Sequence, residues 1–173
     1  MLQVSNIEEI FKEYFQVAIV PDRIIELGTM SAKFTHIIHG LRSAINNNFD
    51  IITFDQRRDV RAEYLPWNMI FCQMDIFLNM DFIINLIKSR TLILCDNGNK
   101  IREVQSLAPH LKQDCVIMAH DYFHDKYLFE HQPSGTSWPA CEITWSDVEH
   151  LGLKPYYQEI MQRGYWLSLT NIK

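Results

Sequence analysis

The sequence predicts an α/β protein, a single domain over residues 1–173 built on a doubly wound, mostly parallel β-sheet. Short apolar runs typical of buried strands alternate along the chain with segments whose apolar residues recur at helical spacing. Two of these runs, 23–27 and 50–54, enclose one helical segment, and such a βαβ unit requires a parallel strand pair with a right-handed crossover. The 173 residues, 47% hydrophobic and 21% charged, suit one compact domain with a sizeable core.

The N-terminal part of the chain supplies this βαβ unit. Its predicted helices carry apolar residues three and four positions apart, and its strands are apolar runs bounded by turn residues. Pro21 separates the first helix from the first strand, because proline cannot continue a helix. The predicted elements are a helix within 1–20, a strand at 23–27 that stops at Gly28, a helix over 34–45, and a strand at 50–54 that ends at Asp55.

The same alternation continues toward the C-terminus. The strand at 91–95 is almost free of polar residues, which suits a strand covered on both faces. Between 122 and 144 the pattern dissolves into Tyr, Phe, His, Pro, Gly and Ser residues, and we expect a long ordered loop over the ligand site. The remaining predicted elements are strands at 69–72, 91–95, 115–119 and 165–169, with helices over 80–87, 101–107 and 156–161. The chain therefore divides into an N-terminal helix, a core at 23–121, the loop at 122–144, and a C-terminal helix and strand at 145–173.

Composition and charge exclude several classes of protein. Sixteen Lys and Arg against twenty-one Asp and Glu give a formal charge of −5, so no broad basic face is available for nucleic acid. No apolar run approaches the roughly eighteen residues that span a bilayer, and the first residues lack the pattern of a signal peptide. The four cysteines form no Cys-x-x-Cys pair, which indicates reduced core residues. We therefore expect a soluble cytoplasmic protein without nucleic-acid or membrane partners, and self-association stays open.

Acidic residues follow the predicted parallel strands at the point where each strand ends. In a doubly wound sheet, ligands bind at the carboxyl ends of the strands, near the point where the strand order reverses. A single carboxylate at such a position is commonly a solvated turn residue or a helix cap. Five of them in register favour a ligand site instead. The five are Glu26, Asp55, Asp75, Asp96 and Asp121.

The turn after the first strand indicates which kind of ligand. Gly28 lets the backbone approach a ligand or adopt a positive φ, and Asp55 is placed to accept hydrogen bonds from the two hydroxyls of a ribose. A dinucleotide fingerprint would have three glycines, whereas Met30, Ala32 and Lys33 crowd this turn. A pyrophosphate site is therefore disfavoured. A cofactor with adenosine but no phosphate remains, and S-adenosylmethionine belongs to that class.

Several segments resemble the class I S-adenosylmethionine-dependent methyltransferases. The resemblance rests on Glu26-Leu27-Gly28-Thr29, on Asp55 after its strand, and above all on 91–122, with Leu94-Cys95-Asp96-Asn97-Gly98 and Ala119-His120-Asp121-Tyr122. It spans residues 23 to 122 and is strongest toward the small-molecule and sugar O-methyltransferases of the macrocin O-methyltransferase and cephalosporin-hydroxylase-like type. The resemblance implies a Rossmann-like methyltransferase fold and transfer of a methyl group to an oxygen of a small molecule or sugar.

The resemblance also assigns residues to the cofactor. Glu26 and Gly28, beside Thr29, match the first motif, which holds the methionine end. Asp55 matches the ribose-binding acid, and Gln73 with Asp75 falls where the adenine is recognised. The residues expected to bind the cofactor are thus Glu26, Gly28, Thr29, Asp55, Gln73 and Asp75. Relatives usually have one or two glycines where this chain has Ala32 and Lys33, a departure that would reduce cofactor affinity or rearrange the turn.

Asp96, His120 and Asp121 are the expected catalytic residues. Asp96 and the His120-Asp121 pair match positions that in several relatives bind a divalent cation beside the acceptor hydroxyl. Adjacent strands lie about 4.8 Å apart, close enough for Asp96 and Asp121 to share one Mg²⁺. His120 stands where an acid is often found, and it could serve as the general base for the acceptor hydroxyl. Lys100 and Arg57 are second-tier candidates for contacts to the substrate or to its charge.

Two other kinds of protein compete with this interpretation. A nicotinamide-dependent oxidoreductase could use a similar sheet, but it needs a phosphate-accepting glycine turn that this sequence lacks. A noncatalytic protein that binds S-adenosylmethionine or a nucleotide could keep the same fold, and the reduced glycine content of the turn is its best support.

Overall fold

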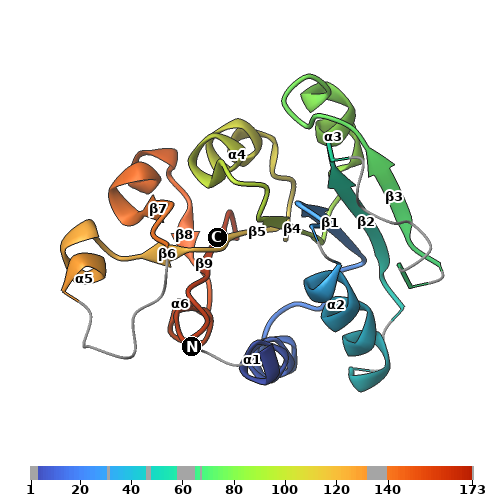
Figure 1. Ribbon diagram of the computed structural model, residues 1–173, viewed down its shortest axis with the longest axis horizontal. Coiled ribbons are helices and arrows are strands. Elements are labelled where there is room, and N and C mark those ends of the chain that lie inside the picture. The colour runs from blue at the N-terminus through green and yellow to red at the C-terminus, as the bar shows by residue number, and fades with distance from the viewer. Residues whose placement is uncertain are drawn as a thin grey trace.

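The computed structural model describes residues 4–30, 32–45, 48–57, 65–66, 68–131 and 140–172. Its main sheet has seven strands in the order β3-β2-β1-β4-β5-β9-β8 (Figure 1). Strands β1 to β5 pair in parallel, whereas β9 runs antiparallel to β5 and β8 antiparallel to β9. The strands are β1 (Arg23–Leu27), β2 (Asp50–Asp55), β3 (Ile70–Gln73), β4 (Thr91–Cys95), β5 (Val116–Ala119), β8 (Lys154–Pro155) and β9 (Leu167–Thr170). The doubly wound, mostly parallel sheet predicted from the sequence is therefore confirmed.

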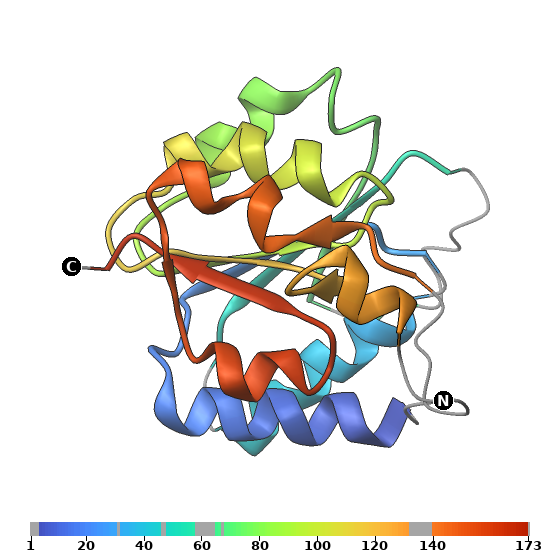
Figure 2. The ribbon, with the colours of Figure 1, turned by 90° about the vertical axis from the view of Figure 1, so that its left-hand side faces the viewer.

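Helices cover both faces of this sheet and make a three-layer sandwich (Figure 1). Helices α1, α2 and α6 lie on one face, and α3, α4 and two short 3₁₀ helices lie on the other. Figure 2 shows α6 lying along α1 on their shared face. The helices are α1 (Val4–Val17), α2 (Lys33–Ala44), α3 (Met80–Leu86), α4 (Lys100–Leu107), α5 (Lys126–Glu130) and α6 (Gln158–Gln162), with 3₁₀ helices η2 (Ala108–His110), η3 (Trp145–Asp147) and η4 (Glu149–Leu151).

Strand β4 shows how the sheet serves two cores at once. All five of its residues are buried. Leu92 and Leu94 pack with α1, α2 and α6, whereas Ile93 and Cys95 pack with α3 and α4. Successive side chains of a strand point to opposite faces, so a strand that is covered on both faces favours apolar residues at nearly every position. The nearly unbroken apolar run in the sequence has this cause.

An aromatic cluster fixes the N-terminal helix to the C-terminal strand. The ring of Trp166, directly before β9, lies 5.0 Å from that of Phe34 in a stacked arrangement and 5.6 Å from that of Phe11 at 89°. Phe11 and Trp166 are almost completely buried. Such pairs add roughly 1 kcal/mol each beyond the burial of their apolar area. The two ends of the chain therefore contribute to one core.

The segment from 122 to 144, predicted to be a long ordered loop, contains helix and strand in its described parts. Strands β6 (Tyr122–Phe123) and β7 (Ile143–Thr144) form a small parallel sheet of their own, and α5 lies between them along the chain. The side chain of Asp125 caps α5 by accepting a hydrogen bond from the backbone N–H of Leu128. Strands of two residues are too short to leave a periodic pattern, which is why the sequence did not reveal them, nor the equally short β8. Residues 132–139 of this segment lie outside the described residues.

Two further expectations concern the cysteines and the membrane. All four cysteines are free; Cys95 and Cys115 are buried as expected, whereas Cys72 and Cys141 are only partly buried. Within the described ranges, no helix is both long and apolar enough to cross a bilayer.

Candidate functional site

A cavity of about 460 Å³ opens at the carboxyl ends of the parallel strands. It lies at β1 and β4, where the strand order reverses, which is the position expected for a ligand in a doubly wound sheet. Its volume falls within the range of small-molecule sites. The residues that line it lie at or after the ends of β1, β2, β4 and β5, or precede β7: Met30, Asp55, Gln56, Arg57, Asp96, Asn97, Gly98, Lys100, His120, Asp121 and Glu142.

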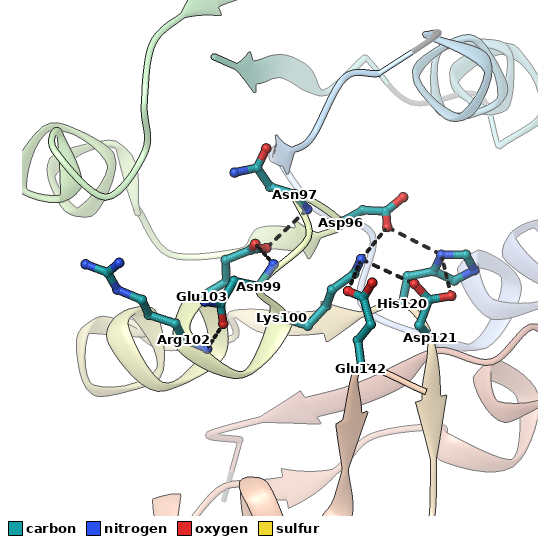
Figure 3. Close-up of polar contacts among 9 residues, drawn as sticks. All are labelled: Asp96, Asn97, Asn99, Lys100, Arg102, Glu103, His120, Asp121 and Glu142. Carbon is teal, nitrogen blue, oxygen red and sulfur yellow. Dashed lines mark hydrogen bonds and ion pairs between the residues drawn. The ribbon is translucent and has the colours of Figure 1, made fainter. Parts of the chain in front are cut away.

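The ammonium group of Lys100 lies at the centre of a group of carboxylates in this cavity (Figure 3). Its Nζ is 2.7 Å from Oε2 of Glu142, 3.2 Å from Oδ2 of Asp121 and 3.3 Å from Oδ1 of Asp96. Only 4% of the lysine side chain is exposed. Burial by itself lowers the pKa of Lys100, but the hydrogen bond to Glu142 and the charges of the two aspartates outweigh burial and raise the pKa above its ordinary value. The side chain therefore stays charged.

Three different elements place these carboxylates. Asp96 continues β4, and its backbone N–H donates to the carbonyl of Leu27 at 2.8 Å. Asp121 follows β5 in a left-handed conformation with φ 58°, which aspartate tolerates better than most residues. Glu142 precedes β7, and its backbone N–H donates to the carbonyl of Asp121 at 3.0 Å. The pairing of β6 with β7 thus brings a residue from the predicted loop into the site.

His120 completes the group. Its Nδ1 is 3.4 Å from Oδ1 of Asp96 and 3.6 Å from Oδ1 of Asp121, and its ring lies against Trp166 with centroids 4.8 Å apart. Asp96, His120 and Asp121 each offer one ligand atom, and these atoms lie within 4.8 Å of one another. The structure thus brings together the three predicted catalytic residues, and with them the two predicted metal ligands.

The turn after β1 has the backbone of a glycine-rich loop, although it contains one glycine. Three alternate residues have positive φ, namely Gly28 at 100°, Met30 at 45° and Ala32 at 61°. Lys33 is the first residue of α2, and Met30 is a second position without glycine at which the backbone has a positive φ. Local spacing alone could not show which residues would take the left-handed conformation. The loop keeps its path at the cost of backbone strain in Met30 and Ala32.

Asp55 lines the cavity, but its carboxylate already has protein partners. The backbone N–H of Met30 donates to its Oδ2 at 2.9 Å, and the backbone N–H of Arg57 donates to its Oδ1 at 2.8 Å. The guanidinium of Arg57 also lies against it, with Nε 3.2 Å from Oδ1. A ribose at Asp55 would therefore share the carboxylate with Arg57.

Other predicted cofactor residues lie behind or beside the cavity instead of lining it. Glu26 is buried beneath the turn, where its Oε2 accepts a hydrogen bond from Thr35 at 2.8 Å. Thr29 is buried as well, and its hydroxyl bonds to that of Thr53 at 2.6 Å. Oδ1 of Asp75 accepts from the backbone N–H of Phe77, a local turn contact. Residues that the structure places outside the cavity lining are Glu26, Gly28, Thr29, Gln73 and Asp75.

Burial affects the acidity of Glu26. Its pKa is raised from 4.5 to about 7, chiefly because burial removes the carboxyl group from water. The hydrogen bonds from Thr53 and Thr35 lower the pKa, and the charges of Asp96 and Asp55 raise it further. The carboxyl is therefore neutral in mildly acidic solution.

Glu142 is the residue that the sequence did not reveal. It lies in a segment without a recognisable element, so no signal marked it. The sequence indicates Lys100 only as a secondary candidate, although it stands four residues after Asp96 at the start of a predicted helix, a spacing at which two side chains can meet.

The fold resembles that of several solved structures. The apo-structure of CmcI is 15% identical to this chain, with a TM-score of 0.67, and the match covers 100% of this chain and 73% of CmcI. A structure of CmcI with Mg and S-adenosylmethionine (SAM) is also 15% identical, with a TM-score of 0.63 and coverage of 98% and 74%. The MycE methyltransferase from the mycinamycin biosynthetic pathway, in complex with Mg and S-adenosylhomocysteine (SAH), is 12% identical, with a TM-score of 0.56 and coverage of 98% and 49%.

No family model and no curated protein matches the sequence. The structural likeness confirms the Rossmann-like methyltransferase fold that the sequence resemblance implied.

Proposed function

We propose that this chain is a SAM-dependent methyltransferase that methylates an oxygen of a small molecule or sugar. The observation that carries the proposal is an acidic cavity at the point of strand-order reversal, in a fold shared with CmcI and MycE, whose structures hold SAM or SAH. The glycine-like backbone of the turn after β1 supports it, because this turn adjoins the cavity at Met30.

The charge of the cavity favours this cofactor. Asp96, Asp121 and Glu142 surround the single ammonium of Lys100, so negative charge is in excess. When bound, SAM would supply an electrophilic methyl group on a positively charged sulfonium. A cationic ligand gains from such a cavity, whereas a pyrophosphate would be repelled. The same charge argues against the nicotinamide-dependent alternative, and against nucleic acid as a substrate.

The chain's own residues would bind both reactants and take up one proton. Asp55 would accept hydrogen bonds from the ribose hydroxyls, and the carboxylates beside Lys100 would orient the acceptor hydroxyl. The bound cofactor would supply the methyl group that this oxygen receives. The hydroxyl proton passes to the imidazole of His120, which then returns it to water.

Magnesium accompanies the cofactor in the CmcI and MycE structures. The donor atoms of Asp96, His120 and Asp121 lie close enough to share an ion, but the ammonium of Lys100 is already within 3.3 Å of both carboxylates. The residues present therefore do not fit a resident divalent cation.

Calorimetric titration with SAM and SAH tests the proposal. We expect binding of both by the wild-type chain and a loss of affinity of about tenfold or more in Asp55→Asn, which keeps the side-chain shape but not the charge. Asp81→Asn, an exposed aspartate on α3, is the matched control and should bind as the wild type does.

Transfer of a labelled methyl group to a panel of hydroxylated small molecules and sugars then tests catalysis. Absence of cofactor binding by the wild type would contradict the proposal. Binding without transfer to any acceptor, together with unchanged affinity in His120→Ala, would favour the noncatalytic alternative.

A further inference from the structure

We propose that the ammonium group of Lys100 takes the place of a divalent cation in this site, so that the chain binds no metal between Asp96 and Asp121. The role of Lys100 in catalysis rests on the proposed function, but the contacts of its ammonium group do not. It is an alternative to the magnesium prediction made from the sequence, and the two exclude each other.

The position of Nζ is the first argument. It lies 3.2 and 3.3 Å from oxygens of Asp121 and Asp96, the two predicted metal ligands, and 2.7 Å from Glu142 (Figure 3). A magnesium ion bound by the same two aspartates would need their oxygens at about 2.0–2.1 Å. An ion bound by Oδ1 of Asp96 at that distance would lie beside the ammonium, which contacts the same oxygen at 3.3 Å. Two positive charges so close repel each other, so we expect a metal to enter only if Lys100 leaves.

Its surroundings are the second argument. Lys100 is the first residue of α4, a position where the helix dipole disfavours a positive charge. Its side chain is also 96% shielded from solvent, since only 4% is exposed. Three carboxylates compensate for both costs. Those contacts make the lysine part of the folded site, and its departure would leave the carboxylates unpaired.

The third carboxylate is matched to the number of donors on an ammonium. An ammonium has three N–H groups, and three carboxylates, from Asp96, Asp121 and Glu142, have an oxygen within 3.3 Å of Nζ. Glu142 reaches the site through the β6–β7 pair and through its backbone hydrogen bond to Asp121. The small second sheet therefore completes the coordination of a lysine.

This arrangement changes how the site would act. An ammonium holds the carboxylates in place and neutralises part of their charge, as a metal ion would, but it does not bind the acceptor oxygen as a Lewis acid. Deprotonation of the acceptor would then depend on a side chain at the cavity, and His120 lies beside both aspartates.

Binding of Mn²⁺, followed by electron paramagnetic resonance, tests the proposal without any acceptor. We expect no site on the wild-type chain. Lys100→Ala should gain one Mn²⁺ site with affinity at least about tenfold above any wild-type binding, because three carboxylates and an imidazole become available. Asp121→Asn added to Lys100→Ala should remove that gain. Lys112→Ala, which removes an exposed lysine, is the matched control and should gain nothing.

Three results would overturn the proposal. The first is a Mn²⁺ site on the wild type that Asp121→Asn abolishes. The second is a folded Lys100→Ala variant that binds no more Mn²⁺ than the wild type does. The third is an SAH affinity of the wild type that falls when a chelator is added. If Lys100→Ala fails to fold, added Mn²⁺ should restore its circular dichroism spectrum. If Mn²⁺ restores the spectrum of neither Lys100→Ala nor Lys100→Gln, the result counts against the proposal. SAH titration of the wild type reports separately on the proposed function, since its failure leaves the Mn²⁺ result standing.

Discussion

A Cβ atom placed on Gly28 would lie 2.3 Å from the backbone carbonyl oxygen of Asp96. Gly28 directly follows β1 and Asp96 directly follows β4, and the two strands are neighbours in the sheet. Gly28 also has φ 100°, a conformation that residues with a side chain rarely adopt. The two chain segments that border the cavity therefore approach each other closely only because this residue is glycine.

Gly28→Ala should destabilise the protein by about 3 kcal/mol or more, since it adds a clash with rigid backbone to an unfavourable φ. Gly98→Ala is the matched control: Gly98 has φ 93°, but a Cβ there would meet nothing within 4 Å. We expect this second variant to lose only about 1–2 kcal/mol, the cost of the left-handed conformation. Urea denaturation of both variants measures the difference. Equal losses would show that the close approach to Asp96 has little energetic weight.

Ala32→Gly should stabilise the protein. Ala32 has φ 61° before α2, a conformation that costs an alanine about 1 kcal/mol or more relative to glycine. Part of that gain is offset by the greater freedom of glycine in the unfolded chain, so we expect a net gain of about 0.5–1 kcal/mol in the free energy of unfolding.

Ala108→Gly serves as the control for this substitution, because Ala108 has φ −53° at the end of α4. Glycine brings no relief there, and we expect a loss of about 1 kcal/mol. Destabilisation of similar size in both variants would contradict the strain assigned to the turn after β1.

The parts of the site that the sequence revealed are those fixed by regular parallel strands. Asp55, Asp96 and Asp121 could be predicted to share one edge, because each directly follows a buried apolar run and the carboxyl ends of parallel strands meet. Glu142 could not, because the two-residue strand that places it has no periodicity. Nor could the positive φ of Met30, since a side chain at that position gives no sign of a glycine-like backbone. The regular elements thus follow from local pattern, whereas the contacts between loops depend on tertiary structure.

Glu26 should make the stability of the protein depend on pH. Its pKa is about 7 in the folded protein against 4.5 in the unfolded chain, because it is buried. The folded state therefore holds the proton more tightly, so the contribution of Glu26 to stability is greatest below pH 4.5 and is lost as the pH rises toward 7. Glu26→Gln removes this part of the pH dependence, whereas buried Glu103, whose pKa is also raised to about 7, contributes its own part in both proteins. We expect it to match the wild type at pH 5 and to exceed it at pH 8 by roughly 3 kcal/mol at most.

Chemical denaturation at the two pH values measures this effect. Glu159→Gln, an exposed glutamate on α6, controls for the loss of one charge and should follow the wild type at both. The same difference between Glu26→Gln and the wild type at pH 5 and pH 8 would show that burial does not hold the proton on Glu26.

Arg57→Ala should tighten the binding of SAH a few-fold. The guanidinium of Arg57 lies 3.2 Å from Oδ1 of Asp55, the carboxylate that we expect to receive the ribose hydroxyls. A ligand must share or displace that contact. The Arg57 side chain is 42% exposed, so its ion pair with Asp55 contributes no more than about 1 kcal/mol. Its removal takes the guanidinium away from the carboxylate and leaves the backbone hydrogen bonds from Met30 and from residue 57 in place. Calorimetric titration of Arg57→Ala beside Asp55→Asn separates the two roles. Weaker SAH binding in both variants would mean that Arg57 itself contacts the ligand. Tighter binding in Arg57→Ala with weaker binding in Asp55→Asn would identify Asp55 as the ribose acceptor and Arg57 as the group that competes for it.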